Sequence, residues 1–170
     1  MLRLKHISIT QYKNYEYFNL PLHKMVVGIS GKNGRGKTNL LDAVFYGCFT
    51  RSYFTSSDQW CARQGESGFR LELDFELEDE LKKVVCIYRG GNKKEILLND
   101  VPYEKFSQHI GTFPVVMIAP DDIELITDGS EVRRKFIDTM ISQLNPEYLQ
   151  LLIRYNKILA QRNSVLKQWH

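Results

Sequence analysis

A glycine-rich stretch near the N-terminus holds the residue types best suited to bind an anion. It runs from Gly31 to Thr38 and fits the spacing G-x-x-x-x-G-K-[ST] without a gap. Glycine lets the backbone turn with positive φ, and its missing side chain lets N–H groups approach a phosphate closely. In this motif the lysine, here Lys37, reaches the β- and γ-phosphates, and the Thr38 hydroxyl binds Mg²⁺. The spacing therefore predicts a cradle for the phosphates of a nucleotide.

The segments on either side supply the strand and the helix that position such a loop. Residues 25–29 form a short continuous apolar run, which predicts a strand buried on both faces. Residues 37–49 carry apolar side chains at helical spacing, and a helix starting there directs its unpaired N–H groups and its dipole at the same anion. This context favours a cradle over a glycine-rich turn that matches by chance. The predicted nucleotide-binding residues of the loop and the first helical turn are Gly31, Lys32, Asn33, Gly34, Arg35, Gly36, Lys37, Thr38 and Asn39.

The remaining apolar patterns predict an α/β domain with a mixed sheet. Apolar runs and alternations predict further strands over residues 2–9, 18–22, 69–77, 84–88, 95–98 and 113–119. Pro21 confines the second of these strands to a sheet edge. Two helices follow near the end of the sequence, the first with Ser130 as its N-cap and the second starting at Asn145-Pro146.

Composition excludes several classes of protein. The chain has 170 residues and a formal net charge of +3, which permits a nucleic-acid partner without requiring one. No apolar run approaches the length of a membrane span, and charges interrupt the first ten residues too often for a signal peptide. Cys48, Cys61 and Cys86 lack metal-ligand spacing, so we expect reduced thiols in a cytoplasmic protein.

Several stretches outside the phosphate loop carry a resemblance to a known family. Gln11-Tyr12-Lys13-Asn14-Tyr15 and residues 38–43, TNLLDA, resemble the SMC and RecF group of ABC-type ATPases. The match narrows to the RecF family through RSYFT, PVVMIAPDD, GSEVRRKFID and YNKILAQRN, which are residues 51–55, 114–122, 129–138 and 155–163. The resemblance covers essentially the whole chain in order.

The resemblance implies an ABC/SMC-type ATPase head. Its ATP-binding lobe, with the phosphate loop and an antiparallel β-lobe, would span residues 1–120, and residues 121–170 would begin a helical lobe. Members of this family bind ATP with Mg²⁺, dimerise through ATP, and bind DNA where single strands meet duplex at gaps. They act with RecR- and RecO-like proteins in replication, recombinational gap repair and the SOS response. Lys13 and Asn14 lie where the family's corresponding residues approach the nucleotide.

The chain departs from the family pattern in its catalytic motifs. Neither the signature motif nor an acidic Walker B strand, both in the C-terminal half of the family's proteins, is visible, so we expect the C-terminal part of the head to be missing. Asp121 and Asp122 follow an apolar run, but their order in the chain suits the Q-loop region better than a Walker B strand. We therefore predict ATP binding, doubt autonomous hydrolysis, and assign no catalytic residue. The alternative is a self-contained P-loop ATPase or kinase of another family.

Two groups of basic residues admit two interpretations each. Arg133-Arg134 either contacts phosphate or a lobe interface, or forms a solvated helix face. A cluster of basic residues around the predicted hairpin either faces DNA or keeps an exposed edge strand from pairing with another chain. Its members are Lys82, Lys83, Arg89, Lys93 and Lys94.

Overall fold

The computed structural model describes residues 1–91 and 93–167. The chain divides into two compact units, Met1–His109 and Ile110–His170. The last three residues of the expected helical lobe, 168–170, lie outside the described part of the chain.

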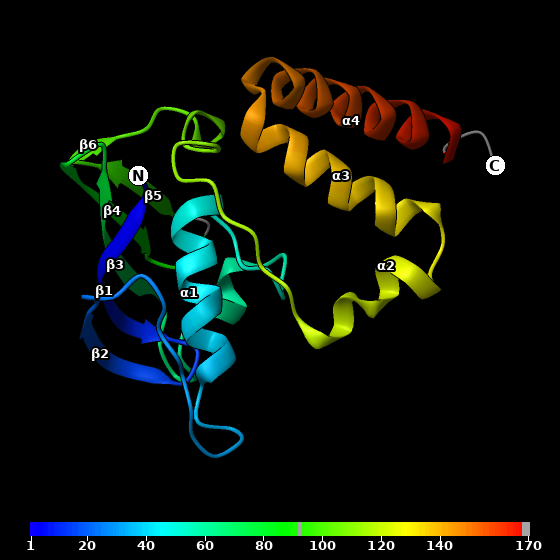
Figure 1. Ribbon diagram of the computed structural model, residues 1–170. Coiled ribbons are helices and arrows are strands. Elements are labelled where there is room, and N and C mark those ends of the chain that lie inside the picture. Colours follow the sequence, from blue (N-terminus) through cyan, green and yellow to red (C-terminus); the bar gives the residue numbers. More distant parts are fainter. Residues whose placement is uncertain (92, 168–170) are drawn as a thin grey trace. The chain divides into compact units, whose positions relative to one another are not determined.

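The first unit is built on a six-stranded sheet in the order β2-β1-β3-β4-β5-β6 (Figure 1). Every neighbouring pair is antiparallel. The strands are β1 (Arg3–Tyr12), β2 (Tyr15–Pro21), β3 (Phe69–Leu77), β4 (Glu80–Tyr88), β5 (Lys94–Leu98) and β6 (Val101–Pro102). In β3 the alternation in the sequence buries Phe69, Leu71, Leu73 and Phe75 on one face, as a half-solvated strand requires. The antiparallel lobe is therefore confirmed, with β2 at an edge as expected.

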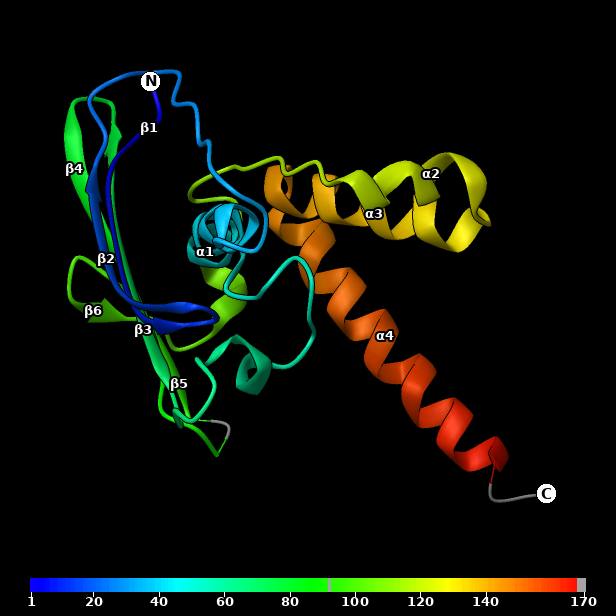
Figure 2. The ribbon, with the colours of Figure 1, turned by 90° about the horizontal axis from the view of Figure 1, so that it is seen from below.

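One helix, α1 (Lys37–Phe49), lies against one face of this sheet (Figure 2). Its buried side chains pack on those of β1 and β3 to form the core of the unit. At Gly47 an added Cβ would lie 2.4 Å from the Leu73 side chain, so glycine is what allows the close approach of helix and strand. Two short 3₁₀ turns, η1 (Asp58–Cys61) and η2 (Phe106–Gln108), complete the unit.

The second unit is helical. It contains η3 (Pro120–Ile123), α2 (Glu124–Thr127), α3 (Ser130–Leu144) and α4 (Pro146–Lys167), with α3 packed on α4. Asn145 caps α4 as predicted, since its side-chain oxygen accepts a hydrogen bond from the Tyr148 N–H at 3.0 Å. The N-cap of α3 is Gly129 rather than Ser130, which is instead the first helical residue. No helix within the described residues is long and apolar enough to cross a membrane.

Two predicted strands are wrong. Residues 25–29 and 113–119 are not strands, and no parallel pair joins the sheet within residues 1–91 and 93–167. A strand needs a hydrogen-bonded neighbour, and no described segment pairs with either run. The Gln143 side chain instead occupies both backbone groups of Val115, accepting from its N–H at 2.8 Å and donating to its carbonyl at 3.1 Å. Apolar composition alone could not reveal that these runs lack a partner strand here.

Candidate nucleotide-binding site

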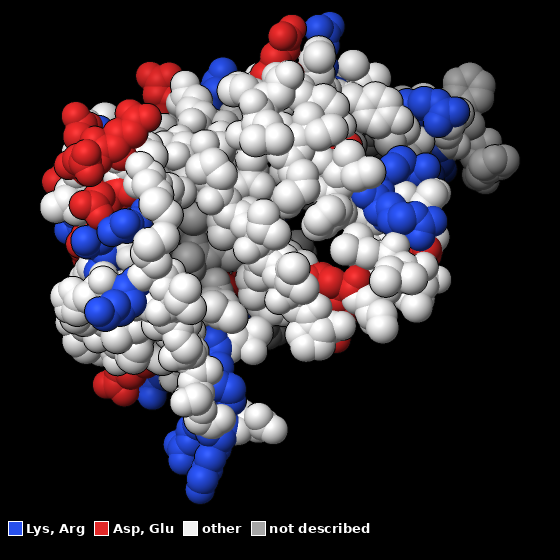
Figure 3. All heavy atoms as spheres, viewed as in Figure 1, with Lys and Arg blue, Asp and Glu red and all other residues white. Residues whose placement is uncertain are grey.

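The phosphate loop has the backbone that its sequence predicts. Gly31, Gly34 and Gly36 all have positive φ, at 148°, 77° and 94°. Helix α1 begins at Lys37, directly after the loop, so its free N–H groups face the loop as expected. Lysine and arginine atoms gather on this projecting loop (Figure 3), and their charge favours an anion there.

The Lys37 side chain folds back over the loop. Its ammonium donates to the carbonyl oxygens of Gly31 at 2.8 Å and Lys32 at 2.9 Å. An ammonium group has three donors, so this placement leaves one to point at a phosphate oxygen while two hold the group over the loop. Two hydrogen bonds thereby hold the flexible side chain over the loop, and a side chain that is already held loses less entropy on binding.

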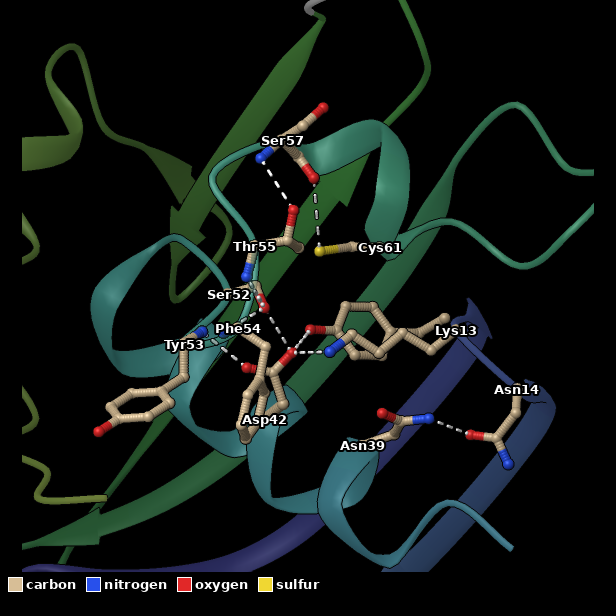
Figure 4. A network of polar contacts seen from close by, with 11 residues as sticks. Lys13, Asn14, Asn39, Asp42, Ser52, Tyr53, Phe54, Thr55, Ser57 and Cys61 are labelled. Carbon is tan, nitrogen blue, oxygen red and sulfur yellow. Dashed lines mark hydrogen bonds and ion pairs between the residues drawn. The ribbon is translucent and has the colours of Figure 1, made fainter. Parts of the chain in front are cut away.

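The turn between β1 and β2 is fastened to the end of the loop. The Asn14 amide donates to the Arg35 carbonyl at 3.2 Å, and the Asn39 amide donates to the Asn14 oxygen at 2.7 Å. The Tyr15 hydroxyl donates to the Gly36 carbonyl at 3.1 Å. The structure thus brings Asn14 and Asn39, both predicted, together beside the loop (Figure 4). The contribution of Tyr15 was not predicted, because an aromatic residue in a strand usually signals packing alone.

Behind this turn, a buried carboxylate accepts hydrogen bonds from several donors. Asp42 on α1 has no exposed surface, and its Oδ2 lies 2.6 Å from the ammonium of Lys13. The hydroxyls of Tyr12 and Ser52 donate to the same oxygen at 2.6 and 2.8 Å, and the Tyr53 N–H donates to Oδ1 at 2.7 Å (Figure 4). A charge buried this deeply is stable only with such partners. The signal that could have revealed it is an aspartate within the apolar stripe of the predicted helix.

Burial sets the protonation states around this carboxylate. Burial first, and then the charge of Asp42, raises the pKa of the Tyr12 hydroxyl, which therefore stays protonated and donates. Burial raises the pKa of the Cys61 thiol, although the neighbouring Lys13 ammonium lowers it in part. Burial raises the pKa of Cys48 to about 12. Cys48, Cys61 and Cys86 are free and buried, which agrees with the expected reduced thiols.

A polar pocket of about 460 Å³ adjoins the first turn of α1. It is lined by Lys13, Asn14, Asn39, Arg63 and Gln64. The loop bearing the last two is held to the end of β1, because the Arg63 N–H donates to the Gln11 carbonyl and the Lys13 N–H to the Cys61 carbonyl, both at 2.8 Å. Lys13 and Asn14 were predicted to approach the nucleotide, whereas Arg63 and Gln64 lie in a polar, irregular stretch that gave no signal.

Two of the candidate residues of the second unit, Asp122 and Arg133, have local partners. The Asp122 carboxylate accepts a hydrogen bond from the Ala119 N–H at 2.6 Å and so holds the start of η3. Arg133 donates to the carbonyls of Leu125 and Asp128 at 3.2 and 2.8 Å, at the C-terminal end of α2. These contacts explain both residues by the local backbone they stabilise.

The basic residues of the hairpin are mostly paired within the sheet. Lys83 pairs with Glu72 at 2.7 Å, and Lys94 pairs with Asp58 at 2.9 Å. Two further ion pairs join Lys82 to Glu80 and Arg89 to Glu95. Residues whose charge is already matched by neighbouring carboxylates attract a nucleic acid weakly, so these pairs favour the structural interpretation.

Comparison with known proteins identifies the family to which this chain belongs. The family model described as an AAA domain matches residues 6–168. The DNA replication and repair protein RecF of Flavobacterium johnsoniae is 40% identical over 166 residues, which are 98% of this chain and 46% of that protein. RecF of Bacteroides thetaiotaomicron is 44% identical over 165 residues, covering 96% of this chain and 45% of the relative. The chain thus spans somewhat less than half the length of these relatives.

Solved structures agree with the sequence matches. The structure of the recombination mediator protein RecF with ATP, from the RecFOR pathway, has a TM-score of 0.88 and 31% identity, covering 98% of this chain and 46% of that one. An SMC head domain from Pyrococcus yayanosii has a TM-score of 0.63 at 15% identity, covers 99% of this chain and 38% of that one, and so shares the fold. These likenesses confirm the predicted head fold and its coverage of only the N-terminal part. The chain belongs to the AAA domain family, and its sequence and fold correspond to the N-terminal part of RecF.

Proposed function

We propose that this chain binds ATP as the N-terminal part of a RecF-like DNA replication and repair ATPase. The observation that carries the proposal is the ordered phosphate loop, in which the Lys37 ammonium is held over glycines of positive φ at the start of α1. This is the arrangement in which backbone N–H groups, the helix dipole and a lysine charge converge on one anion. The similarity to a RecF structure solved with ATP supports the same ligand.

Each residue of the site has a distinct role in this proposal. Lys37 contacts the β- and γ-phosphates, and the Thr38 hydroxyl binds Mg²⁺. The backbone of residues 31–36 surrounds the phosphates. Asn14 and Asn39 fix the loop against the β1–β2 turn, and Lys13, on that turn, lines the neighbouring pocket.

The wider role extends to the whole family protein. ATP binding would gate dimerisation and binding to single-stranded DNA and gap junctions, in the cytoplasm, together with RecR- and RecO-like partners. The RecFOR pathway named for the similar structure supports the partnership. In this scheme residues 1–120 form the ATP-binding lobe and residues 121–170 begin the helical lobe.

Equilibrium binding of a fluorescent ATP analogue to the full 170-residue chain tests the proposal. Lys37→Ala removes the ammonium from the loop and is expected to weaken binding by at least about tenfold, the effect of losing one charge-assisted phosphate contact. Lys82→Ala, which removes a lysine paired with Glu80 on β4, is the matched control and should bind as the wild type does. Equal affinities for wild type and Lys37→Ala would contradict the proposal.

A further inference from the structure

Two lysine–aspartate pairs in the first unit have nearly the same composition. In one, Lys13 pairs with Asp42 at 2.6 Å and the Tyr12 hydroxyl donates to the carboxylate. In the other, Lys94 pairs with Asp58 at 2.9 Å, and the Tyr46 hydroxyl donates to that carboxylate at 2.7 Å. The two lysine side chains are similarly buried, with 14% and 13% of their surface exposed.

The two pairs differ in what the lysine borders. Lys13 lines the polar pocket beside the phosphate loop together with Asn14 and Asn39. Lys94 lies on β5, where its ammonium sits over the rings of Tyr46 and Phe106 at 5.0 and 5.4 Å. The second pair is therefore explained by its place in the core, whereas the lysine of the first pair also lines a polar pocket.

Lys13 is held unusually firmly for a lysine. Its backbone adopts a φ of 49°, and its N–H donates to the Cys61 carbonyl at 2.8 Å. Its ammonium lies 5.7 Å from the centroid of the Tyr12 ring and 5.2 Å from that of Phe54. Lysine has a flexible four-carbon stem, so a fixed ammonium requires an anchor at its end as well as at its backbone.

Asp42 provides that anchor, and it is itself immobilised. Its two oxygens accept from Tyr12, Ser52 and the Tyr53 N–H, so the carboxylate cannot turn without losing several hydrogen bonds (Figure 4). Asp42 also belongs to the same helix whose first residues, Lys37 and Thr38, end the phosphate loop. The position of the Lys13 ammonium is thereby fixed relative to that loop by a rigid element.

We propose that Asp42 is a positioning residue that holds the Lys13 ammonium at the wall of the nucleotide pocket, where the ammonium contacts phosphate oxygens of the bound nucleotide. Asp42 does not touch the nucleotide, and it acts through Lys13 alone. One ammonium donor serves Asp42, which leaves others for an anionic oxygen. The inference rests on the proposed function, because it assigns a role within the same ATP site.

A double-mutant cycle on the full chain tests this role. ATP affinity is measured with Mg²⁺ by calorimetry for wild type, Asp42→Asn, Lys13→Met and the double variant, below the unfolding temperature of each. Asp42→Asn keeps the shape and an acceptor for the Tyr53 N–H but removes the charge. Each single variant is expected to bind ATP about tenfold more weakly, which is the effect on affinity of losing one charge-assisted hydrogen bond. The double variant should bind ATP no more weakly than Lys13→Met, because the two changes remove the same contact.

Asp58→Asn is the matched control, since it breaks the equivalent pair away from the pocket. It should lower the unfolding temperature as Asp42→Asn does and leave ATP affinity unchanged. Asp42→Glu, which keeps the charge but shifts it by one methylene, serves if Asp42→Asn does not fold, and it should weaken ATP binding only when Lys13 is present. Equal weakening by Asp42→Asn with and without Lys13, or equal weakening by Asp58→Asn, would overturn the inference. If the proposed function itself is wrong, the result is different, because wild type and Lys37→Ala would then have the same ATP affinity.

Discussion

A methyl group at Gly36 tests how the phosphate loop is joined to the β1–β2 turn. Gly36 has a φ of 94°, and a Cβ built there would lie 2.4 Å from the Asn14 amide nitrogen. Gly36→Ala therefore imposes backbone strain of about 1 kcal/mol and forces the Asn14 side chain away. Asn14 would lose its hydrogen bonds to Arg35 and Asn39, each worth about 0.5 kcal/mol at this exposed position. The total expected loss in the free energy of unfolding is about 2 kcal/mol.

Gly34→Ala separates the two contributions. Gly34 has a φ of 77°, yet nothing lies within 4 Å of an added Cβ, so this variant incurs only the backbone strain of about 1 kcal/mol. Urea unfolding of both variants measures the difference, which should be about 1 kcal/mol, or about 3 °C in unfolding temperature. Gly36→Ala should also bind ATP more weakly than Gly34→Ala. Equal stabilities for the two variants would refute the proposed junction.

Two further predictions concern acid stability and turnover. Burial lowers the pKa of His109, although a hydrogen bond to the Gly47 carbonyl raises it in part, so the folded state keeps the imidazole neutral where the unfolded state binds a proton. The unfolding free energy should therefore fall as pH drops below about 6.5 towards the lowered folded pKa, by at most about 1.4 kcal/mol per pH unit. Urea unfolding of His109→Gln should lose this pH dependence. An unchanged slope of unfolding free energy against pH in that variant would contradict the role of His109. The second prediction is that the purified chain releases no phosphate from ATP in steady-state assays, and turnover that Asp121→Asn or Asp122→Asn abolishes would show instead that it is a self-contained enzyme.

The parts of the site that the sequence predicts are those fixed by local rules. The phosphate loop and α1 follow from glycine spacing and a contiguous helical pattern, which need little from the rest of the chain. The antiparallel strands β1 and β3 follow from alternation for the same reason. Asn145 is recognisable as a cap because the cap and the helix it serves are adjacent in sequence.

The parts that escaped prediction depend on distant partners. Asp42 meets Lys13 and Ser52 only after β1, α1 and the following loop have come together. Arg63 and Gln64 reach the pocket because backbone hydrogen bonds join their loop to the end of β1. The strand predictions for the two apolar runs are wrong for the same reason. A run such as residues 25–29 becomes a strand only beside a hydrogen-bonded neighbour.

Calorimetric titration of Mg²⁺-ATP into the full 170-residue chain, alongside Lys37→Ala, measures whether the phosphate loop binds ATP through the Lys37 ammonium. We expect saturable binding at one site per chain for the wild type, and binding weakened by at least about tenfold when the ammonium over the loop is removed. Absence of binding by a folded wild-type chain, or identical titrations for the two proteins, would contradict it.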